Sequence, residues 1–255
     1  MTKLIICGAG GRMGREISNM VKGSRDIEVI AGIETSGHDL VGTQLNGINI
    51  TDDIETVIEK ADCIVDFTNH SATIDNMKKA QAYKKPYVTG TTGFSQEELK
   101  KIDVLAKSFP IFLASNMSVG VNHLYNMVQS SVSILGDYEI ELVEAHHRAK
   151  KDAPSGTAKA IAKIIKQARP DTEFIYGREG VAGERKKNEI CINSIRGGDI
   201  VGEHRVLFLG QGEFIELRHC ATSRSCFAAG ALEAVKFIIN KAPGLYSMRD
   251  MLTKV

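Results

Sequence analysis

The sequence predicts an α/β fold made of two domains, and three observations lead to this prediction. Short apolar runs alternate with helix-like segments over residues 1–118, which is typical of βαβ units in a parallel sheet. A glycine-rich turn, "GAGGRMG", joins the first apolar run to the first helix-like segment. Beyond residue 118, strand-like runs follow one another through short glycine-containing connections, which favours a mixed or antiparallel sheet in a second, α+β domain.

The first domain is expected to contain short parallel strands separated by helices. The strands are predicted at 3–7, 28–34, 63–68, 86–90 and 111–115. The segment 11–23 should form a helix that stops at Gly23. Its predicted buried stripe consists of Met13, Ile17, Met20 and Val21. A second helix should end near Tyr83, and a third should open at Ser95, which has capping-box spacing to Glu98.

The second domain is expected to combine two helices with several strands. The helices are predicted at 119–135 and 157–168, and the strands at 139–147, 189–195, 200–210 and 213–223. The later helix should bury a stripe of Ala158, Ile161, Ile165 and Ala168. The polar, charged segment 170–188 is interpreted as a mobile loop. With one more helix at about 228–240, the predicted domains are 1–118 with 227–255, and 119–226.

Composition and charge argue against several classes of protein. The formal net charge of +1 does not indicate binding to nucleic acid or to an anionic membrane, so any anion site must be local. The five cysteines are odd in number and form no CxxC pair, which argues against a disulfide framework and against a metal site. Small buried thiols in a reducing cytoplasm are expected instead. No apolar run reaches the roughly 20 residues that a membrane-spanning helix requires.

The turn "GAGGRMG" predicts a Rossmann-type dinucleotide site. Gly8, Gly11 and Gly14 fit G-x-x-G-x-x-G, whereas the last glycine of a strict G-x-G-x-x-G pattern would fall on Met13. Glycines allow the backbone to approach a pyrophosphate, and the N–H groups at the helix start bind that anion. Glu34 lies 20 residues beyond Gly14, at the end of the second predicted strand. A carboxylate there can accept hydrogen bonds from the ribose hydroxyls of NAD.

The residues after Glu34 favour NADH. The 2′-phosphate of NADPH requires a basic partner, whereas Thr35, Ser36, Gly37 and His38 include no Lys or Arg. We therefore expect NADH to be used well and NADPH to be used at best comparably. Two further turns, "GTTG" and "ASNMSVG", follow parallel strands and are candidates to meet the nicotinamide, although ordinary βα turns are the alternative.

The stretch "EAHHRAKKDAPSGTA" gathers titratable and cationic side chains on one loop. His146 and His147 end a predicted strand, so their side chains should point to opposite faces. Histidine titrates near neutrality and can donate a proton, and Lys150 adds a cation four residues after His146. Ser155 or Thr157 should cap the next helix, whose N-terminus suits a substrate carboxylate. The alternative is that these histidines are structural and the basic residues form a solvated face.

Together these motifs resemble the 4-hydroxy-tetrahydrodipicolinate reductase family, also called dihydrodipicolinate reductase. The resemblance extends through "DFT", "SNMSVGVN", "SIRGGDIVGEH" and "ATSR", and so runs nearly end to end. It implies that His146 is the proton donor or acceptor and that Lys150 is the other catalytic residue. It implies substrate contacts by His147, Gly156 and Thr157. It implies cofactor contacts by Gly8, Ala9, Gly10, Gly11, Arg12, Met13, Glu34, Phe67, Gly90, Thr91, Thr92, Ala114, Ser115, Asn116 and Met117.

The resemblance also implies an activity and an assembly. The activity is NAD(P)H-dependent reduction of 4-hydroxy-tetrahydrodipicolinate to tetrahydrodipicolinate in diaminopimelate and lysine biosynthesis. Members of this family are usually homotetramers, so 119–226 is expected to bind substrate and to oligomerise, while 1–118 with 227–255 binds the dinucleotide. Thr35 stands where the family often has a basic residue. The alternatives are a related reductase of another small imino acid and a non-catalytic, NADH-sensing regulator.

Overall fold

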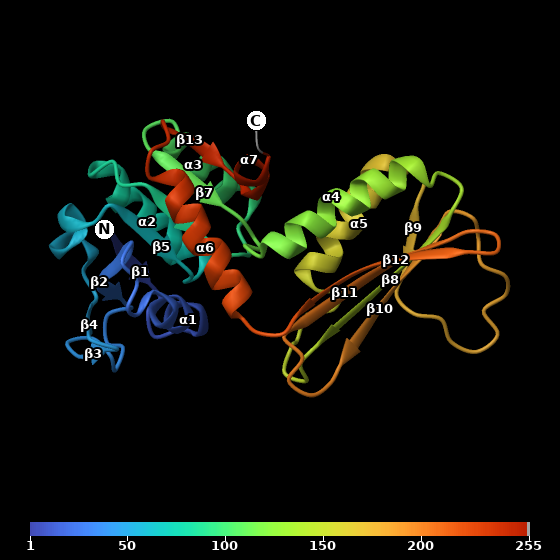
Figure 1. Cartoon of the computed structure of the whole chain (residues 1–255), viewed down its shortest axis with the longest axis horizontal. Helices are drawn as coiled ribbons and strands as arrows, with labels where there is room; N and C mark the ends of the chain where they lie inside the picture. Colours follow the sequence, from blue (N-terminus) through green and yellow to red (C-terminus); the bar gives the residue numbers. More distant parts are fainter. Residues whose placement is uncertain (254–255) are drawn as a thin grey trace. The chain divides into compact units, whose positions relative to one another are not determined.

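The apolar runs of the N-terminal part form an eight-stranded sheet in the computed structural model, which describes residues 1–253 (Figure 1). The strand order is β13-β7-β6-β5-β1-β2-β4-β3, and within the described chain its pairings are parallel except between β3 and β4. The strands are β1 (Thr2–Cys7), β2 (Ile27–Ile33), β3 (Gln44–Leu45), β4 (Ile48–Thr51), β5 (Cys63–Asp66), β6 (Tyr87–Thr89), β7 (Pro110–Leu113) and β13 (Gly244–Tyr246). The five strands expected in the first domain are present, and β3, β4 and β13 are additional.

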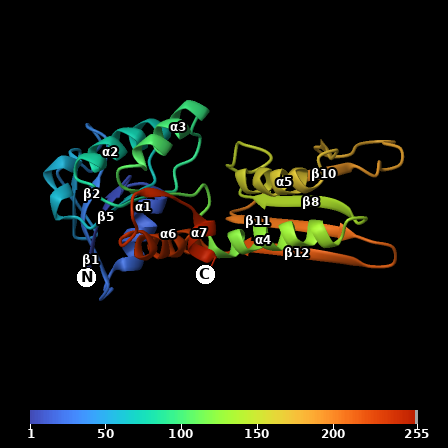
Figure 2. The same cartoon turned by 90° about the horizontal axis from the view of Figure 1, so that it is seen from above.

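Both faces of this sheet are covered by helices (Figure 2). Along β1, Leu4 and Ile6 pack in a core shared with α1 and α6, whereas Ile5 and Cys7 pack in a core shared with α2 and α3. This double burial explains why the strands are apolar without alternation. The helices are α1 (Arg12–Val21), α2 (His70–Ala82), α3 (Gln96–Leu105), α6 (Ser225–Ile238) and α7 (Met248–Leu252), with 3-10 turns η1 (Ile54–Thr56) and η2 (Ile58–Lys60).

A second, five-stranded sheet is mixed, with the order β12-β11-β8-β10-β9. The central strand β8 runs parallel to β10 and antiparallel to β11. One face packs against α4 and α5, where Ile140 and Leu142 share a core with Leu124 and Ile161 (Figure 1). The elements are α4 (Val119–Ile134), β8 (Glu139–His146), α5 (Gly156–Ala168), β9 (Glu173–Ile175), β10 (Glu189–Arg196), β11 (Gly202–Leu209) and β12 (Phe214–Ala221).

The described chain divides into two compact units. One contains residues 1–119 and the segment from Arg224 onward, and the other contains Gly120–Ser223. The domain boundaries predicted from the sequence lie after residues 118 and 226. The first unit has the predicted Rossmann-type parallel sheet and the second has the predicted mixed sheet with helices, so the fold class is confirmed.

Local signals for helix ends are confirmed, but parts of the predicted stripes are wrong. Ser95 and Glu98 form the expected capping box at the start of α3. Met20 is 37% exposed and Ala168 is also exposed. Ala162, which was not part of the predicted stripe, is buried. Met20 and Ala168 lie in the last turns of α1 and α5. At a helix end, burial depends on how far the neighbouring elements extend, which helical spacing does not report.

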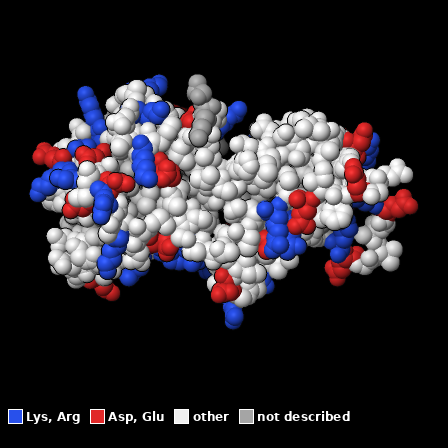
Figure 3. Space-filling model, viewed as in Figure 1, with Lys and Arg blue, Asp and Glu red and all other residues white. Residues whose placement is uncertain are grey.

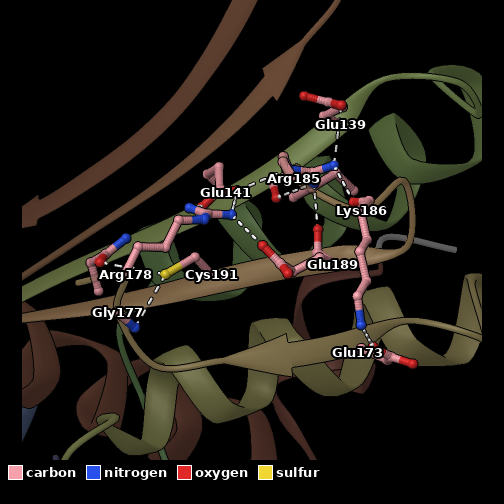
Figure 4. Close-up of polar contacts among 11 residues, drawn as sticks. Glu139, Glu141, Glu173, Gly177, Arg178, Arg185, Lys186, Glu189 and Cys191 are labelled. Atoms are coloured by element: carbon pink, nitrogen blue, oxygen red, sulfur yellow. Dashed lines mark hydrogen bonds and ion pairs between the residues drawn. The ribbon is translucent and has the colours of Figure 1, made fainter. Parts of the chain in front are cut away.

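The segment 170–188 is more structured than the predicted loop. It contains β9, which pairs in parallel with β10. Arg178 binds Glu141 and Glu189, at 2.9 and 2.8 Å, and Arg185 binds Glu141 at 3.1 Å (Figure 4). These ion pairs tie the polar part of the segment to the sheet, because Arg178 meets carboxylates from β8 and β10 and Arg185 meets carboxylates from β8. The two arginines of this segment therefore contact the sheet, while the stretch 176–184 is exposed.

Basic and acidic side chains are interspersed on the face of the molecule drawn in Figure 3, as the formal net charge of +1 suggests. The five cysteines have free thiols, and those of Cys7, Cys63 and Cys191 are buried. Across residues 1–253, no helix is both long enough and apolar enough to span a bilayer.

Candidate active site

The turn between β1 and α1 has the close backbone packing that its glycines predict. Gly8 has φ +78°, and a Cβ there would lie 3.0 Å from the carbonyl oxygen of Phe67. A Cβ at Gly14 would lie 2.2 Å from the Gly8 carbonyl oxygen, so glycine lets α1 start directly against the strand end. Gly11 is the N-cap and supplies no side-chain cap to α1. The first N–H groups of this helix are thus suited to an anion such as a pyrophosphate.

Glu34 projects into a pocket beside this turn. Its Oε1 accepts a hydrogen bond from the Gly10 N–H at 2.6 Å. The pocket, of about 490 Å³, lies at the carboxyl ends of β1, β2 and β5. Among the described residues its lining includes the acids Asp52 and Asp75 but no Lys or Arg. The lining residues are Gly8, Gly10, Gly11, Ile33, Glu34, Thr35, Ser36, His38, Asp52, Phe67, Thr68, Asn69, Ala72, Asp75 and Asn76.

The predicted cofactor residues follow the carboxyl ends of the parallel strands, and the structure separates them into two groups. Gly8, Gly10, Gly11, Glu34 and Phe67 line the pocket. The others are Ala9, Arg12, Met13, Gly90, Thr91, Thr92, Ala114, Ser115, Asn116 and Met117, which do not line it. Of these, Ala9, Ala114 and Met117 are buried in the core, Met13 packs against it, and Arg12 is exposed at the start of α1. The remainder lie in the turns after β6 and β7.

A buried carboxylate organises the turns after β5 and β6. Asp66 is fully buried, and its Oδ2 accepts hydrogen bonds from Tyr87 and Asn76 at 2.5 and 3.1 Å. Its Oδ1 accepts a hydrogen bond from the Thr73 hydroxyl at 3.0 Å, and Thr73 also bonds Thr91 at 2.9 Å. Burial first, and then the charge of Asp66, raises the pKa of Tyr87. The predicted cofactor turn at Thr91 therefore rests on an acid that sequence reasoning had treated as part of a strand.

In the second unit, two residues of β8 lie on the face that α4 and α5 cover. Glu144 and His146 are two positions apart and point the same way, and His146 Nδ1 lies 2.5 Å from Glu144 Oε2. Arg196 is the register partner of His146 on β10. Its guanidinium donates two hydrogen bonds to the Glu144 carboxylate, at 2.9 and 2.7 Å. Glu144 itself has no exposed side-chain surface.

The neighbouring strand β11 adds a second histidine to this group. His204 pairs in register with Glu144, is 3% exposed, and packs edge-on against the His146 ring at 5.3 Å between centroids. Its Nε2 lies 2.9 Å from the Ser155 hydroxyl. Burial, supported by the nearby His146, lowers the pKa of His204 to about 3. His204 is therefore neutral near pH 7, and its imidazole adds bulk without charge.

The loop after β8 holds the predicted cation in an ion pair. Lys150 Nζ lies 2.8 Å from Asp152 Oδ1, and this bond lowers the pKa of Asp152. His147 is the first residue after β8 and is half-buried, whereas Arg148 and Lys151 are exposed. Arg148 and Lys151 therefore fit the alternative of a solvated basic face, whereas Lys150 is held in an ion pair.

The start of α5 lies next to the Glu144 group. Ser155 is the N-cap, and its hydroxyl accepts a hydrogen bond from the Ala158 N–H at 3.2 Å, so Ser155 and not Thr157 caps the helix. The Ser155 N–H donates to Glu144 at 3.2 Å. Thr157 bonds with Tyr125, whose pKa is raised by burial. Gly156 is exposed at the first position of the helix, where a carboxylate can reach backbone N–H groups.

Sequence reasoning missed Glu144, Arg196 and His204 as members of this site. A strand period of two could have placed Glu144 on the same face as His146. Arg196 and His204 come from strands more than 45 residues further along, and only the pairing of β8 with β10 and β11 brings them to Glu144. No spacing rule connects them within the sequence.

Two family models together cover most of the chain. "Dihydrodipicolinate reductase, N-terminus" matches residues 2–117, and "Dihydrodipicolinate reductase, C-terminus" matches residues 120–252. The chain belongs to the dihydrodipicolinate reductase family. The first range lies within the first unit, whereas the second range covers the second unit and continues into the C-terminal segment of the first. The family assignment therefore includes both the nucleotide turn and the Glu144–His146 group.

Individual members of the dihydrodipicolinate reductase family match over their whole length. A 4-hydroxy-tetrahydrodipicolinate reductase of Caldanaerobacter subterraneus subsp. tengcongensis is 43% identical, covering 100% of this chain and 99% of the relative. The enzyme of the same name from Citrifermentans bemidjiense is 40% identical over 99% of each chain. The dipicolinate-bound dihydrodipicolinate reductase from Paenisporosarcina sp. TG-14 has a TM-score of 0.81 at 24% identity, over 99% of each chain, which shows the shared fold.

Proposed function

We propose that this chain catalyses the NAD(P)H-dependent reduction of 4-hydroxy-tetrahydrodipicolinate to tetrahydrodipicolinate, a step of diaminopimelate and lysine biosynthesis. It is an oxidoreductase that uses a nicotinamide cofactor. One observation carries the proposal: within a full-length family match, His146 bonds to a buried carboxylate directly before the loop that presents Lys150 and the start of α5. A proton donor, a cation and a helix N-terminus together suit a small dicarboxylate.

The second unit binds the substrate in this proposal. Gly156 and Thr157 hold one carboxylate through the N–H groups at the start of α5. Lys150 exchanges Asp152 for the substrate and polarises it, and His147 adds a contact at the end of β8. His146 exchanges the proton with the substrate ring. Lys150 thus contributes charge for substrate binding and His146 transfers the proton, so substitutions of the two residues should affect KM and kcat differently.

The first unit fits a nicotinamide dinucleotide. The glycines at 8 and 14 let the turn and the start of α1 pack closely against neighbouring backbone, and Glu34 projects into the adjoining pocket. The bound cofactor supplies a hydride. The chain's own contribution is to hold the pyrophosphate at the start of α1 and the ribose at Glu34.

The direct test is oxidation of NADH and NADPH by the purified protein, followed by absorbance, with enzymatically generated 4-hydroxy-tetrahydrodipicolinate. Turnover that requires this substrate supports the proposal. Turnover with another cyclic imino acid and none with this one would instead identify a related reductase. Binding of NADH without turnover of any imine would leave the regulator as the better explanation, and a proton donor at His146 would then have no use.

We also propose NADH as a cofactor that the enzyme uses well, with NADPH at best comparable. The pocket that receives Glu34 is lined by three acids, Glu34, Asp52 and Asp75, and among described residues by no Lys or Arg. Acidic lining favours ribose hydroxyls and disfavours a 2′-phosphate, because like charges repel in a partly enclosed pocket.

A homotetramer joined through the second sheet is proposed as the assembly. The face of this sheet opposite α4 and α5 presents apolar side chains, with Ile195 51% exposed and Phe214 63% exposed. Such a face is suited to a second copy of the same chain. Light scattering after gel filtration tests this: a particle of about four times the 27.8 kDa chain mass is expected, and a monomer would contradict it.

The cytoplasm is proposed as its location. The five free thiols fit a reducing compartment, and the proposed biosynthetic step uses a nicotinamide cofactor. Fractionation of the source cells, with an antibody to this chain, would place it in the soluble cytoplasmic fraction or show otherwise.

A further inference from the structure

We propose that Glu144, held by Arg196, is a positioning residue that fixes the His146 imidazole with Nδ1–H donated to the carboxylate and Nε2 left to exchange the reaction's proton. The inference rests on the function proposed above, in which His146 moves that proton. It assigns a role to two residues, Glu144 and Arg196, that do not themselves need to touch the substrate.

The bonds of Glu144 show that its charge is already balanced without His146. A carboxylate with no exposed surface needs a partner, and Arg196 provides one through two parallel hydrogen bonds. The Ser155 N–H occupies a further site on Oε1, at 3.2 Å. The bond from His146 to Oε2, at 2.5 Å, is therefore additional to the ion pair. A purely structural acid–arginine pair would not require a third, titratable partner.

The protonation state of Glu144 decides that of the histidine nitrogen facing it. Burial alone would raise the pKa of Glu144, but hydrogen bonds from His146 and Arg196 outweigh burial, and the pKa lies well below its usual value. An ionised carboxylate has acceptors and no donor. His146 Nδ1 must therefore carry the hydrogen of this bond, and Nε2 is the atom whose proton can come and go.

Two neighbours preserve this orientation. A Cβ at Gly202 would lie 3.1 Å from His146 Nε2, so glycine at this place keeps a side chain away from the reactive atom. The His204 ring, at 73° to that of His146, blocks the imidazole on another side. The charged or titratable groups facing His146 and His204 are Glu144 on β8, Arg196 on β10, His219 on β12 and Lys150 in the loop.

The test combines histidine nitrogen NMR with steady-state kinetics on the full-length protein. In the wild type, the neutral form of His146 should be the Nδ1–H tautomer. Glu144→Gln places an amide beside Nδ1, which can donate to it, so the neutral ring should change to the Nε2–H tautomer. The kcat should fall about 10- to 100-fold while KM for substrate changes less than about threefold.

Glu141→Gln is the matched control. Glu141 lies on the same strand and is also paired with arginine, but it binds Arg178 and Arg185 and does not contact His146 (Figure 4). The His146 tautomer and the kcat of this variant should equal those of the wild type. A folded Glu144→Gln with the wild-type His146 tautomer and wild-type kcat would overturn the proposal.

If Glu144→Gln does not fold, the nitrogen NMR spectrum of wild-type His146 tests the proposed tautomer by itself. An Nε2–H tautomer for neutral His146 in the wild type would overturn the assignment. Failure of the proposed function is distinguishable, because the wild type would then not reduce the substrate while its His146 spectrum could still show Nδ1–H.

Discussion

Lys150 forms an ion pair with Asp152, two residues along the same loop, at 2.8 Å between Nζ and Oδ1. In the proposed function, the substrate takes the place of Asp152 on the lysine, so the ion pair competes with substrate binding. Asp152→Asn should lower KM for substrate by about 1.4- to fivefold, which corresponds to the roughly 0.2–1 kcal/mol typical of exposed ion pairs. Its kcat should change little. Steady-state kinetics check this, and a raised KM would show that Asp152 orients the lysine for substrate.

Removing the proton donor and removing the cation should have different kinetic effects. His146→Gln should reduce kcat by about 100-fold or more, with a smaller change in KM, because proton transfer is lost while binding remains. Lys150→Ala should reduce kcat and also raise KM, since it loses charge that holds the substrate. Lys151→Ala, an exposed neighbour, is the control and should behave as wild type. Near-wild-type turnover of either active-site variant would contradict the proposed roles.

The acid-lined pocket beside Glu34 predicts a change of cofactor preference from one substitution. Thr35→Arg adds a cation beside Glu34 and should raise kcat/KM for NADPH relative to NADH by about tenfold. Thr35→Gln adds similar length without charge and should leave the ratio unchanged. Initial rates with both cofactors measure this. If wild-type kcat/KM for NADPH exceeded that for NADH by more than about tenfold, the interpretation of the pocket would be wrong.

Gly14 should tolerate no side chain, because a Cβ would meet the Gly8 carbonyl oxygen at 2.2 Å. Gly14→Ala must push α1 away from the strand end, which should cost about 1–3 kcal/mol of stability and raise KM for NADH. Gly136→Ala is the control, because a Cβ there has no neighbour within 4 Å among the described residues. Thermal melts and NADH titrations compare the two. Equal melting temperatures would show that the turn can relax.

Buried, neutral His204 should make the fold sensitive to acid. Its pKa is about 3 in the folded chain against 6.5 ordinarily, so between these values the unfolded state binds one more proton. Stability should therefore fall as the pH is lowered through this range. His204→Gln should reduce the slope of unfolding free energy against pH, between about pH 5 and 6, by up to about 1.4 kcal/mol per pH unit. Denaturant melts at several pH values measure it, with exposed His123→Gln as control.

Much of the architecture could be predicted because it depends on local order along the chain. Apolar runs without alternation identified the parallel strands, and the Ser95–Glu98 spacing identified the start of α3. The glycine turn and Glu34 could be placed together, because the carboxyl ends of adjacent parallel strands meet at one sheet edge. Strand β13 could not be predicted, since three residues carry too little pattern and their pairing partner is β7.

The sequence by itself determined the family, the nucleotide turn and the loop that carries His146 and Lys150, because each is a contiguous motif whose chemistry follows from residue type and spacing. Only the tertiary structure decided which side chains surround and orient His146. Glu144, Arg196 and His204 converge through the pairing of β8 with β10 and β11, and Lys150 meets Asp152 through the path of the loop. The physical reason is that strand register and burial are set by packing between distant segments, and the protonation of a buried group depends on those neighbours.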